Sequence, residues 1–265
     1  MSRQITAWIF GLCALSFASG VFANGVFQLV KGDVKVAVGA GSPASVKPGQ
    51  RFQPGSSFTT GPNSQAILRF DDGQAIVLDQ NSEFLLDGYN FNRTKPQEDN
   101  ISMQILKGAL RAVTGLIGQR SRGRFALVAP QATIGIRGTD FMVALTNQGY
   151  VSVLQGSVAV TNSAGTVGFG AGTLGAVANG TTLATTITAA GLPAAASTAF
   201  SALSGVNITL GAAAIGSGGG ASAGAGAGAA AAGGGGALGA TAAAIAVGVA
   251  GVASATNKNS TVSNH

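Results

Sequence analysis

The chain has almost none of the residues on which most catalytic and metal sites depend. Its 265 residues include one cysteine, Cys13, and one histidine, His265. Neither can join a second residue of its kind in a zinc site, and no internal histidine is present to complete a nucleophilic triad. A Gly-Lys-Ser/Thr phosphate loop is also missing from the sequence. These absences predict that the protein is not an enzyme and that it holds no cofactor or metal ion.

Charge is missing from most of the second half of the chain. The sequence contains 15 basic and 9 acidic residues, yet no Lys, Arg, Asp or Glu occurs between Asp140 and Lys258. A soluble folded domain normally keeps a charged surface. The distribution therefore predicts a charged domain followed by a segment of another kind.

Residues 1–23 have the features of a secretory signal peptide. Arg3 supplies a positive charge, and residues 7–18 form an apolar run that is too short to span a bilayer. Small residues precede the expected cleavage point after Ala23, at the positions that a signal peptidase reads. We expect the mature protein in the periplasm or outside the cell. A retained N-terminal anchor is the alternative.

Residues 24–178 have the pattern of β-structure. Three stretches, 27–34, 103–110 and 151–158, each roughly alternate apolar and polar residues up to a Lys or Gln, reach a glycine and then resume. Alternation with a period of two is typical of a half-buried strand, and glycine permits a bend or bulge. We predict an all-β fold, either a twisted β-sandwich or an irregular β-roll of short antiparallel strands.

The pair Asp71 and Asp72, followed by Gly73, lies between two apolar runs and predicts a hairpin turn. Paired carboxylates can take part in acid–base or calcium chemistry, but a turn exposes its side chains to water. We therefore interpret both aspartates as solvated turn residues, and we expect Asp79 and Glu83 to face outward as well.

Beyond residue 178 the composition changes. Residues 179–215 form a connecting segment in which 193–203 suits a short helix, and residues 216–236 are entirely Gly, Ala and Ser. Such a composition buries too little surface to offset the entropy of ordering the backbone. We interpret residues 216–236 as a flexible linker.

Residues 237–256 are uncharged, rich in Ala, Val and Ile, and about long enough to cross a bilayer. Small residues spaced by four would share one face of a helix, as in packed membrane helices. We expect a membrane-associated helix here, with a self-associating Ala-rich helix and an unfolded segment as alternatives. Residues 257–265 form a polar tail.

An ordered set of motifs resembles the FecR domain, a periplasmic β-domain of bacterial iron-uptake signalling regulators and of stand-alone exported proteins. The resemblance covers nearly all of residues 25–177. Its motifs are, in order, Gly32-Asp33-Val34, Lys47-Pro48-Gly49-Gln50, Thr59 to Ala66, Phe70-Asp71-Asp72-Gly73, Leu78 to Ser82, Leu106-Lys107-Gly108, Ala129-Pro130, Ile136 to Phe141 and Gln155-Gly156-Ser157-Val158.

The resemblance implies an exported β-scaffold that binds a partner, without fixing which one. The signalling regulators carry a cytoplasmic helical segment that holds a sigma factor and then one membrane helix before this domain. A cleavable signal stands in that place here, so anti-sigma activity is not expected.

One motif is interpreted as a corner of the fold. Gly138 suits a bend beside a strand, and the next residue could hydrogen-bond the backbone of that bend. The flanking charges could pair across the corner, and a ligand-binding Arg137 is the alternative. The fold-corner motif comprises Arg137, Gly138, Thr139 and Asp140.

Five basic residues follow one another without an intervening acid and form a candidate patch for an anionic partner. Phosphates of lipopolysaccharide, carboxylates of the cell wall or an acidic protein face would suit it, and a solvated basic loop is the alternative. Nucleic acid is not expected, because the loop lacks interleaved aromatic residues and the protein is exported. The patch comprises Lys107, Arg111, Arg120, Arg122 and Arg124.

Together these features predict a non-enzymatic exported FecR-domain scaffold that binds an envelope protein or an anionic envelope polymer. One alternative is a periplasmic sensory component that relays signals in an iron-uptake-type system. Another is a surface protein that self-associates. The expected partners are thus an envelope protein or polymer, the membrane through residues 237–256, and further copies of the chain.

Overall fold

The computed structural model describes residues 24–208, apart from the side chain of Arg122. The predicted signal peptide, the linker over 216–236, the segment 237–256 and the polar tail lie outside the described residues. Within residues 24–208, no helix is long and apolar enough to cross a membrane.

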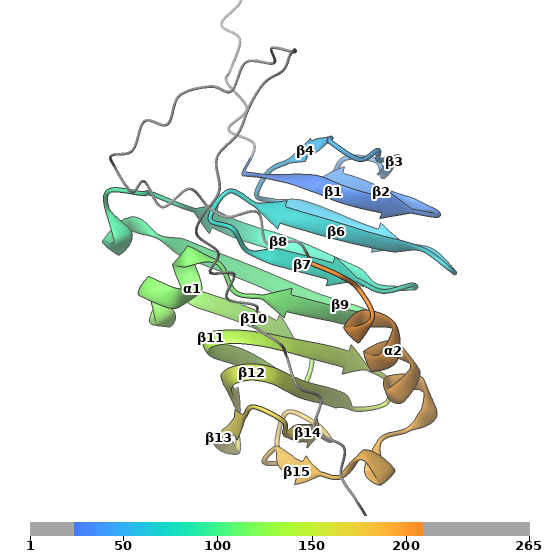
Figure 1. Ribbon diagram of the computed structural model, residues 1–265, viewed down its shortest axis with the longest axis vertical. Coiled ribbons are helices and arrows are strands. Elements are labelled where there is room, and N and C mark those ends of the chain that lie inside the picture. The colour runs from blue at the N-terminus through green and yellow to red at the C-terminus, as the bar shows by residue number, and fades with distance from the viewer. Residues whose placement is uncertain (1–23, 209–265) are drawn as a thin grey trace, which may run out of the picture. The chain divides into compact units, whose positions relative to one another are not determined.

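All strands belong to one continuous hydrogen-bonded sheet that folds over into two layers (Figure 1). The first layer contains, in order, β4 (Arg51–Phe52), β1 (Gly25–Lys31), β6 (Gln65–Phe70), β7 (Ala75–Leu78), β9 (Asn100–Val113), β11 (Ala132–Leu145), β12 (Gly149–Asn162), β14 (Leu174–Val177) and β15 (Thr185–Ile187). The second contains β3 (Ala44–Ser45), β2 (Val34–Val38), β5 (Ser56–Thr60), β8 (Glu83–Asn90), β9, β10 (Phe125–Ala129), β11, β12 and β13 (Gly165–Gly170).

Three long strands, β9, β11 and β12, take part in both layers because each bends in the middle. The N-terminal part of β9 pairs with β8, whereas the part from Gly108 onward pairs with β7 and β11. Likewise, β12 pairs with β14 before Gly156 and with β13 after it. The φ angles of Gly108 and Gly156 are +81° and +75°, in the region that favours glycine.

The bends are also too crowded for a larger residue. A Cβ on Gly108 would collide with Ser82, and one on Gly156 would collide with the carbonyl oxygen of Gly138. Gly32, between β1 and β2, has φ +75° and would collide with Ser64 in the same way. The three glycines of the recurring sequence pattern therefore mark equivalent corners at which the chain passes between layers.

The main core lies between the two layers and is rich in phenylalanine. Ring centroids of Phe27, Phe58 and Phe70 lie 5.2–5.4 Å from that of Phe52, in edge-to-face geometry. Such aromatic pairs add about 0.5–1.5 kcal/mol each beyond the area that they bury. Aromatic side chains of the N-terminal half of the domain thus pack around Phe52.

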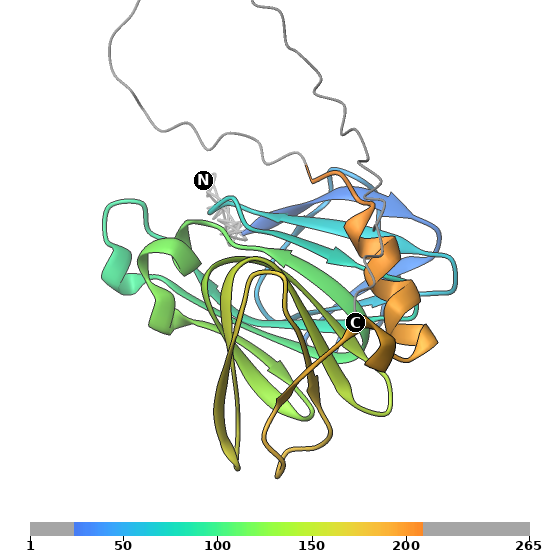
Figure 2. The same cartoon turned by 60° about the horizontal axis from the view of Figure 1, so that its bottom comes forward.

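The outer face of the first layer is covered by helix α2 (Ala194–Ser204), seen in orange in Figures 1 and 2. Its buried residues Ala196, Phe200 and Leu203 form a second core with side chains of β7, β11 and β12. The helix occupies the place where the sequence predicted one. Other short elements are α1 (Leu116–Arg120), η1 (Pro96–Glu98), η2 (Arg122–Arg124) and η3 (Ala189–Gly191).

The predicted all-β fold is confirmed. Two details differ from the expectation of short antiparallel strands. Strands β9, β11 and β12 have 14 residues each, because one strand serves two layers. Strand β10 also pairs in parallel with β9, because α1 and η2 carry the chain back to the start of that strand.

Candidate functional site

Arg111, a member of the predicted basic patch, is used inside the protein. It lies on β9, and its Nε and Nη2 donate to the two carboxylate oxygens of Asp140 at 2.8 and 2.7 Å. Its Nη1 donates to the carbonyl oxygens of Leu203 and Val206, at the end of α2. The hydrogen bonds that Arg111 donates to Asp140 raise the pKa of Arg111 above its ordinary value. This side chain holds α2 on the sheet and is not open to a partner.

Arg120 is also held internally. Its guanidinium pairs with the fully buried Asp99, with Nε 2.8 Å from Oδ2, and also donates to the carbonyl oxygens of Asn92 and Arg93. It lies 5.0 Å from the ring centroid of Phe91, a cation–π distance. Arg120 therefore ties α1 to the loop between β8 and β9.

The remaining described members of the patch, Lys107 and Arg124, are exposed. Arg124 lines one open hollow together with Arg120, whereas Arg111 is paired with Asp140 inside the fold. Lys107 lies beside the bend of β9 and opposite Glu83, which is exposed as expected. Of the described members of the patch, Arg120 and Arg124 therefore share one hollow.

The corner motif forms a bend of β11, with Gly138 at φ +57°. Thr139 is buried, and its backbone N–H donates to Oγ1 of Thr114 at 3.0 Å, while that hydroxyl donates to the carbonyl oxygen of Thr139 at 2.7 Å. The bend of β11 is therefore hydrogen-bonded to Thr114, the residue that directly follows β9. Asp140 pairs with Arg111 and not with Arg137, the pairing that the sequence suggested.

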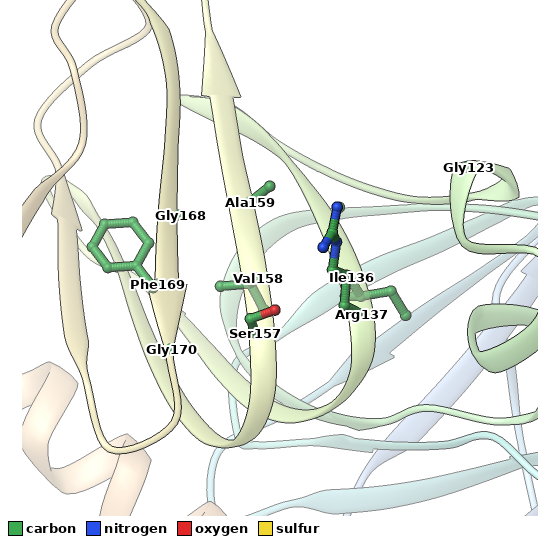
Figure 3. A pocket seen from close by; sticks show the side chains of 10 residues that line it. Gly123, Ile136, Arg137, Ser157, Val158, Ala159, Gly168, Phe169 and Gly170 are labelled. Carbon is green, nitrogen blue, oxygen red and sulfur yellow. The ribbon is translucent and has the colours of Figure 1, made fainter.

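Arg137 is exposed and lines a hollow of about 540 Å³ (Figure 3). In Figure 3 the side chains of Arg137, Ser157 and Ala159 extend toward the side on which Gly123 lies. Glycines of β11 and β13 widen the hollow, and Arg137 is the only charged one among the described residues that line it. A single guanidinium over small neutral residues suits an anionic group such as a carboxylate or phosphate.

The prediction for Asp72 was wrong. Asp71 is exposed and pairs with Arg51, but Asp72 is 1% exposed. Its carboxylate accepts from the backbone N–H of Gln74 and of Ile117, at 3.1 and 3.2 Å, and its own N–H donates to the hydroxyl of Tyr89. The turn is folded beneath the first turn of α1, so one aspartate faces inward.

Burial raises the pKa of Asp72, and burial together with the charge of Asp72 raises the pKa of Tyr89. The expectation that Asp79 faces outward was also wrong, because Asp79 is 9% exposed and burial raises its pKa. No sequence signal marks these two carboxylates as buried, since the residues that cover them lie far along the chain. Among the described residues, no group of three or more His, Cys, Asp or Glu side chains could hold a metal ion.

The fold and these contacts define an all-β module in which Gly138 and Thr139 form a corner of the fold, and Arg137 is exposed in a hollow whose other described lining residues are neutral. Residues 56–159, from β5 into β12, match the family model described as FecR protein. This part of the chain is therefore similar to FecR domains, as its motifs predicted.

Two crystal structures of a candidate anti-sigma factor from Parabacteroides distasonis are similar to part of the chain, with TM-scores of 0.40 and sequence identities of 16 and 17%. The match covers 49% of this chain and 58% of that protein. The comparison with curated proteins found no match.

Proposed function

We propose that the protein is a non-catalytic signal-relay component of the cell envelope, acting in a system of the iron-uptake type. The observation that carries the proposal is the FecR family match over residues 56–159, because the family is regulatory. The features of an export signal in residues 1–23 support a periplasmic location for the β-domain.

The relay has more support than the scaffold that the sequence first suggested. A scaffold for an anionic polymer would need several basic side chains on one surface. Two members of the predicted patch, Arg111 and Arg120, are instead paired with Asp140 and Asp99. One exposed cation in a defined hollow suits the recognition of a single anionic group on a partner protein.

In this proposal, the hollow at Arg137 receives an acidic side chain of the partner. Arg137 and Ser157 lie opposite each other on β11 and β12, so both are held in place by a paired sheet. The bend at Gly138 and the buried Thr139 fix the end of β11 next to them. A partner bound there would contact residues held by paired strands. Binding alone could then transmit the signal, without any chemical reaction.

The test is photo-crosslinking in living cells, with a photoreactive residue placed at Ser157 in the hollow. The matched control carries the same residue at Val38, which is 47% exposed on β2, in the other half of the molecule. We expect one envelope protein to be captured from position 157 and not from position 38, and the capture to be lost when Arg137→Glu is added. Capture that is equal at the two positions, or unchanged by Arg137→Glu, would exclude the hollow as the partner site.

A further inference from the structure

A groove lies along one side of helix α2, and it shares no lining residue with the hollow at Arg137. It consists of two adjoining hollows of about 320 and 190 Å³, which have Asp79 and Gln80 in common. The turn between β7 and β8, which carries these two residues, forms one side of the groove, and α2 forms the other. Residues from the bend of β9 and the end of β11 also line the wider hollow.

The groove has room for a ligand because the residues that α2 contributes to it are small. They follow the i, i+3, i+4 and i+7 spacing that places side chains on one face of a helix. Phe200 and Leu203, on another face of α2, are buried in the second core. Large residues thus hold α2 on the sheet, and the face beside them is left with small ones. The small residues that line the groove are Ala195, Thr198, Ala199 and Ala202.

The carboxylate of Asp79 lies in this groove without a counter-ion from the described residues. Asp79 is 9% exposed and lines both hollows. Its backbone N–H donates to the carbonyl oxygen of Ala109, and its own carbonyl oxygen accepts from Oγ1 of Thr60, so the side chain is what remains for a ligand. None of the ion pairs formed among residues 24–208 includes Asp79.

The chemistry of the groove favours an ammonium group as the missing cation. A buried carboxylate is costly unless a cation or hydrogen-bond donors compensate for the lost water. A metal ion would need more ligands of its own kind, and the described residues contain no suitable group of them. An ammonium group donates three hydrogen bonds, and charge-assisted bonds to a carboxylate are strong. Further acceptor oxygens are available on side chains that line the wider hollow, namely Gln80, Asn81, Thr146 and Thr198.

The rest of the groove indicates what the ammonium group is attached to. Ala109, Ala144 and Leu145 line the wider hollow and give it an apolar part, where an alkyl chain would be removed from water. Lys31 lines the narrower hollow and would repel a second positive charge there. The ligand that fits both parts therefore has a single positive charge and a short aliphatic chain.

We propose that the groove beside α2 binds the ammonium group of an aliphatic amine, with Asp79 as its counter-ion and the alkyl chain against Ala109, Ala144 and Leu145. The amine is either a free small molecule or the lysine side chain of a partner protein, because both carry the same group on the same kind of chain.

The test is titration of the full chain with n-butylammonium chloride at constant ionic strength, followed through the amide NMR signals of the protein. The control ligand is n-butanol, which has the same alkyl chain without the charge. We expect saturable shifts at the amides of Gln80, Asn81 and Ala109 with butylammonium, and binding of butanol that is weaker by about tenfold or more. Butanol that binds as tightly as butylammonium would overturn the proposal.

Two pairs of variants locate the site. Asp79→Asn should weaken butylammonium binding by about tenfold or more, whereas Asp87→Asn, at an exposed carboxylate on β8, should leave the affinity unchanged. Thr198→Phe should fill the groove and prevent binding, whereas Ser197→Phe, at an exposed position of α2 that does not line the groove, should not. Circular dichroism shows whether each variant is folded, and the phenylalanine pair tests the site even if Asp79→Asn is not. Unchanged affinity in a folded Asp79→Asn variant, or equal affinity in the two phenylalanine variants, would overturn the proposal.

A blocked lysine, Nα-acetyl-lysine N-methylamide, distinguishes the two sources of the amine. It presents the same butylammonium group on a piece of peptide backbone. Binding tighter than that of n-butylammonium would support a lysine side chain of a partner protein, and weaker binding would support a free amine. Binding of neither compound would overturn the proposal.

Discussion

The ion pair between Arg111 and Asp140 is expected to carry an unusual share of the stability, and Arg111→Met tests this. The two side chains are 14 and 16% exposed, and the pair is bidentate, with N–O distances of 2.8 and 2.7 Å. The substitution keeps an apolar side chain of similar length on β9 but leaves Asp140 without its counter-ion. It also removes two hydrogen bonds to carbonyl oxygens at the end of α2.

The magnitude follows from how far the pair is removed from water. Breaking a fully buried pair by deleting one partner costs about 3–5 kcal/mol. This pair still reaches solvent on one side, so the charge left on Asp140 can be partly hydrated. We therefore expect the free energy of unfolding to fall by about 2–4 kcal/mol, including about 1 kcal/mol for each lost hydrogen bond that water does not replace.

The assay is urea unfolding followed by far-ultraviolet circular dichroism. The matched control is Lys35→Met, which breaks the exposed pair between Lys35 and Asp33, with 44 and 56% exposure, and should cost at most about 1 kcal/mol. Adding Asp140→Asn to Arg111→Met should recover part of the loss, because the unpaired charge is removed. A loss for Arg111→Met no larger than that of Lys35→Met would refute the reasoning.

Three further predictions follow from the structure. Gly108→Ala should lower the free energy of unfolding by about 2 kcal/mol or more, because φ at this position is +81° and the new methyl group meets Ser82. The control Gly123→Ala, with open space around the new methyl group, should change the free energy of unfolding by less than about 1 kcal/mol. Urea unfolding of both variants checks this. The pKa of Asp72 is raised on folding, so its contribution to stability should decrease as pH rises from about 4, the unfolded value, through the raised pKa. The free energy of unfolding of Asp72→Asn relative to the natural chain should therefore increase between pH 4 and pH 7, and a constant difference would contradict the assignment. Mass spectrometry of the exported protein should give Asn24 as its first residue; an intact residue 1–23 segment would support the retained anchor instead.

The sequence predicted those parts of the fold that depend on local chemistry. Gly32, Gly108 and Gly156 were recognisable as corners because a bend with positive φ requires glycine whatever surrounds it. The hairpin at Gly73 was predictable for the same reason. The FecR resemblance could be identified because these turns recur in a fixed order along the chain.

The contacts that decide the candidate site are long-range, and local patterns do not contain them. Arg111 and Asp140 are 29 residues apart, and Arg120 and Asp99 are 21 apart, so nothing adjacent in sequence showed that these charges were paired. Asp72 resembles any turn aspartate until α1, more than forty residues later, is placed over it. Basic residues that are close together in the sequence therefore have different environments in the structure. Arg111 and Arg120 form internal ion pairs, whereas Lys107 and Arg124 are exposed to solvent.

The relay itself is tested most directly by transcription in the natural host. Transcripts are compared under iron limitation in a strain that lacks the chain, in the same strain supplied with the natural chain, and in one supplied with Arg137→Glu. The account predicts that a small set of transport genes loses induction without the chain, regains it with the natural chain and fails to regain it with Arg137→Glu. Induction that is unchanged in the strain lacking the chain would contradict the account.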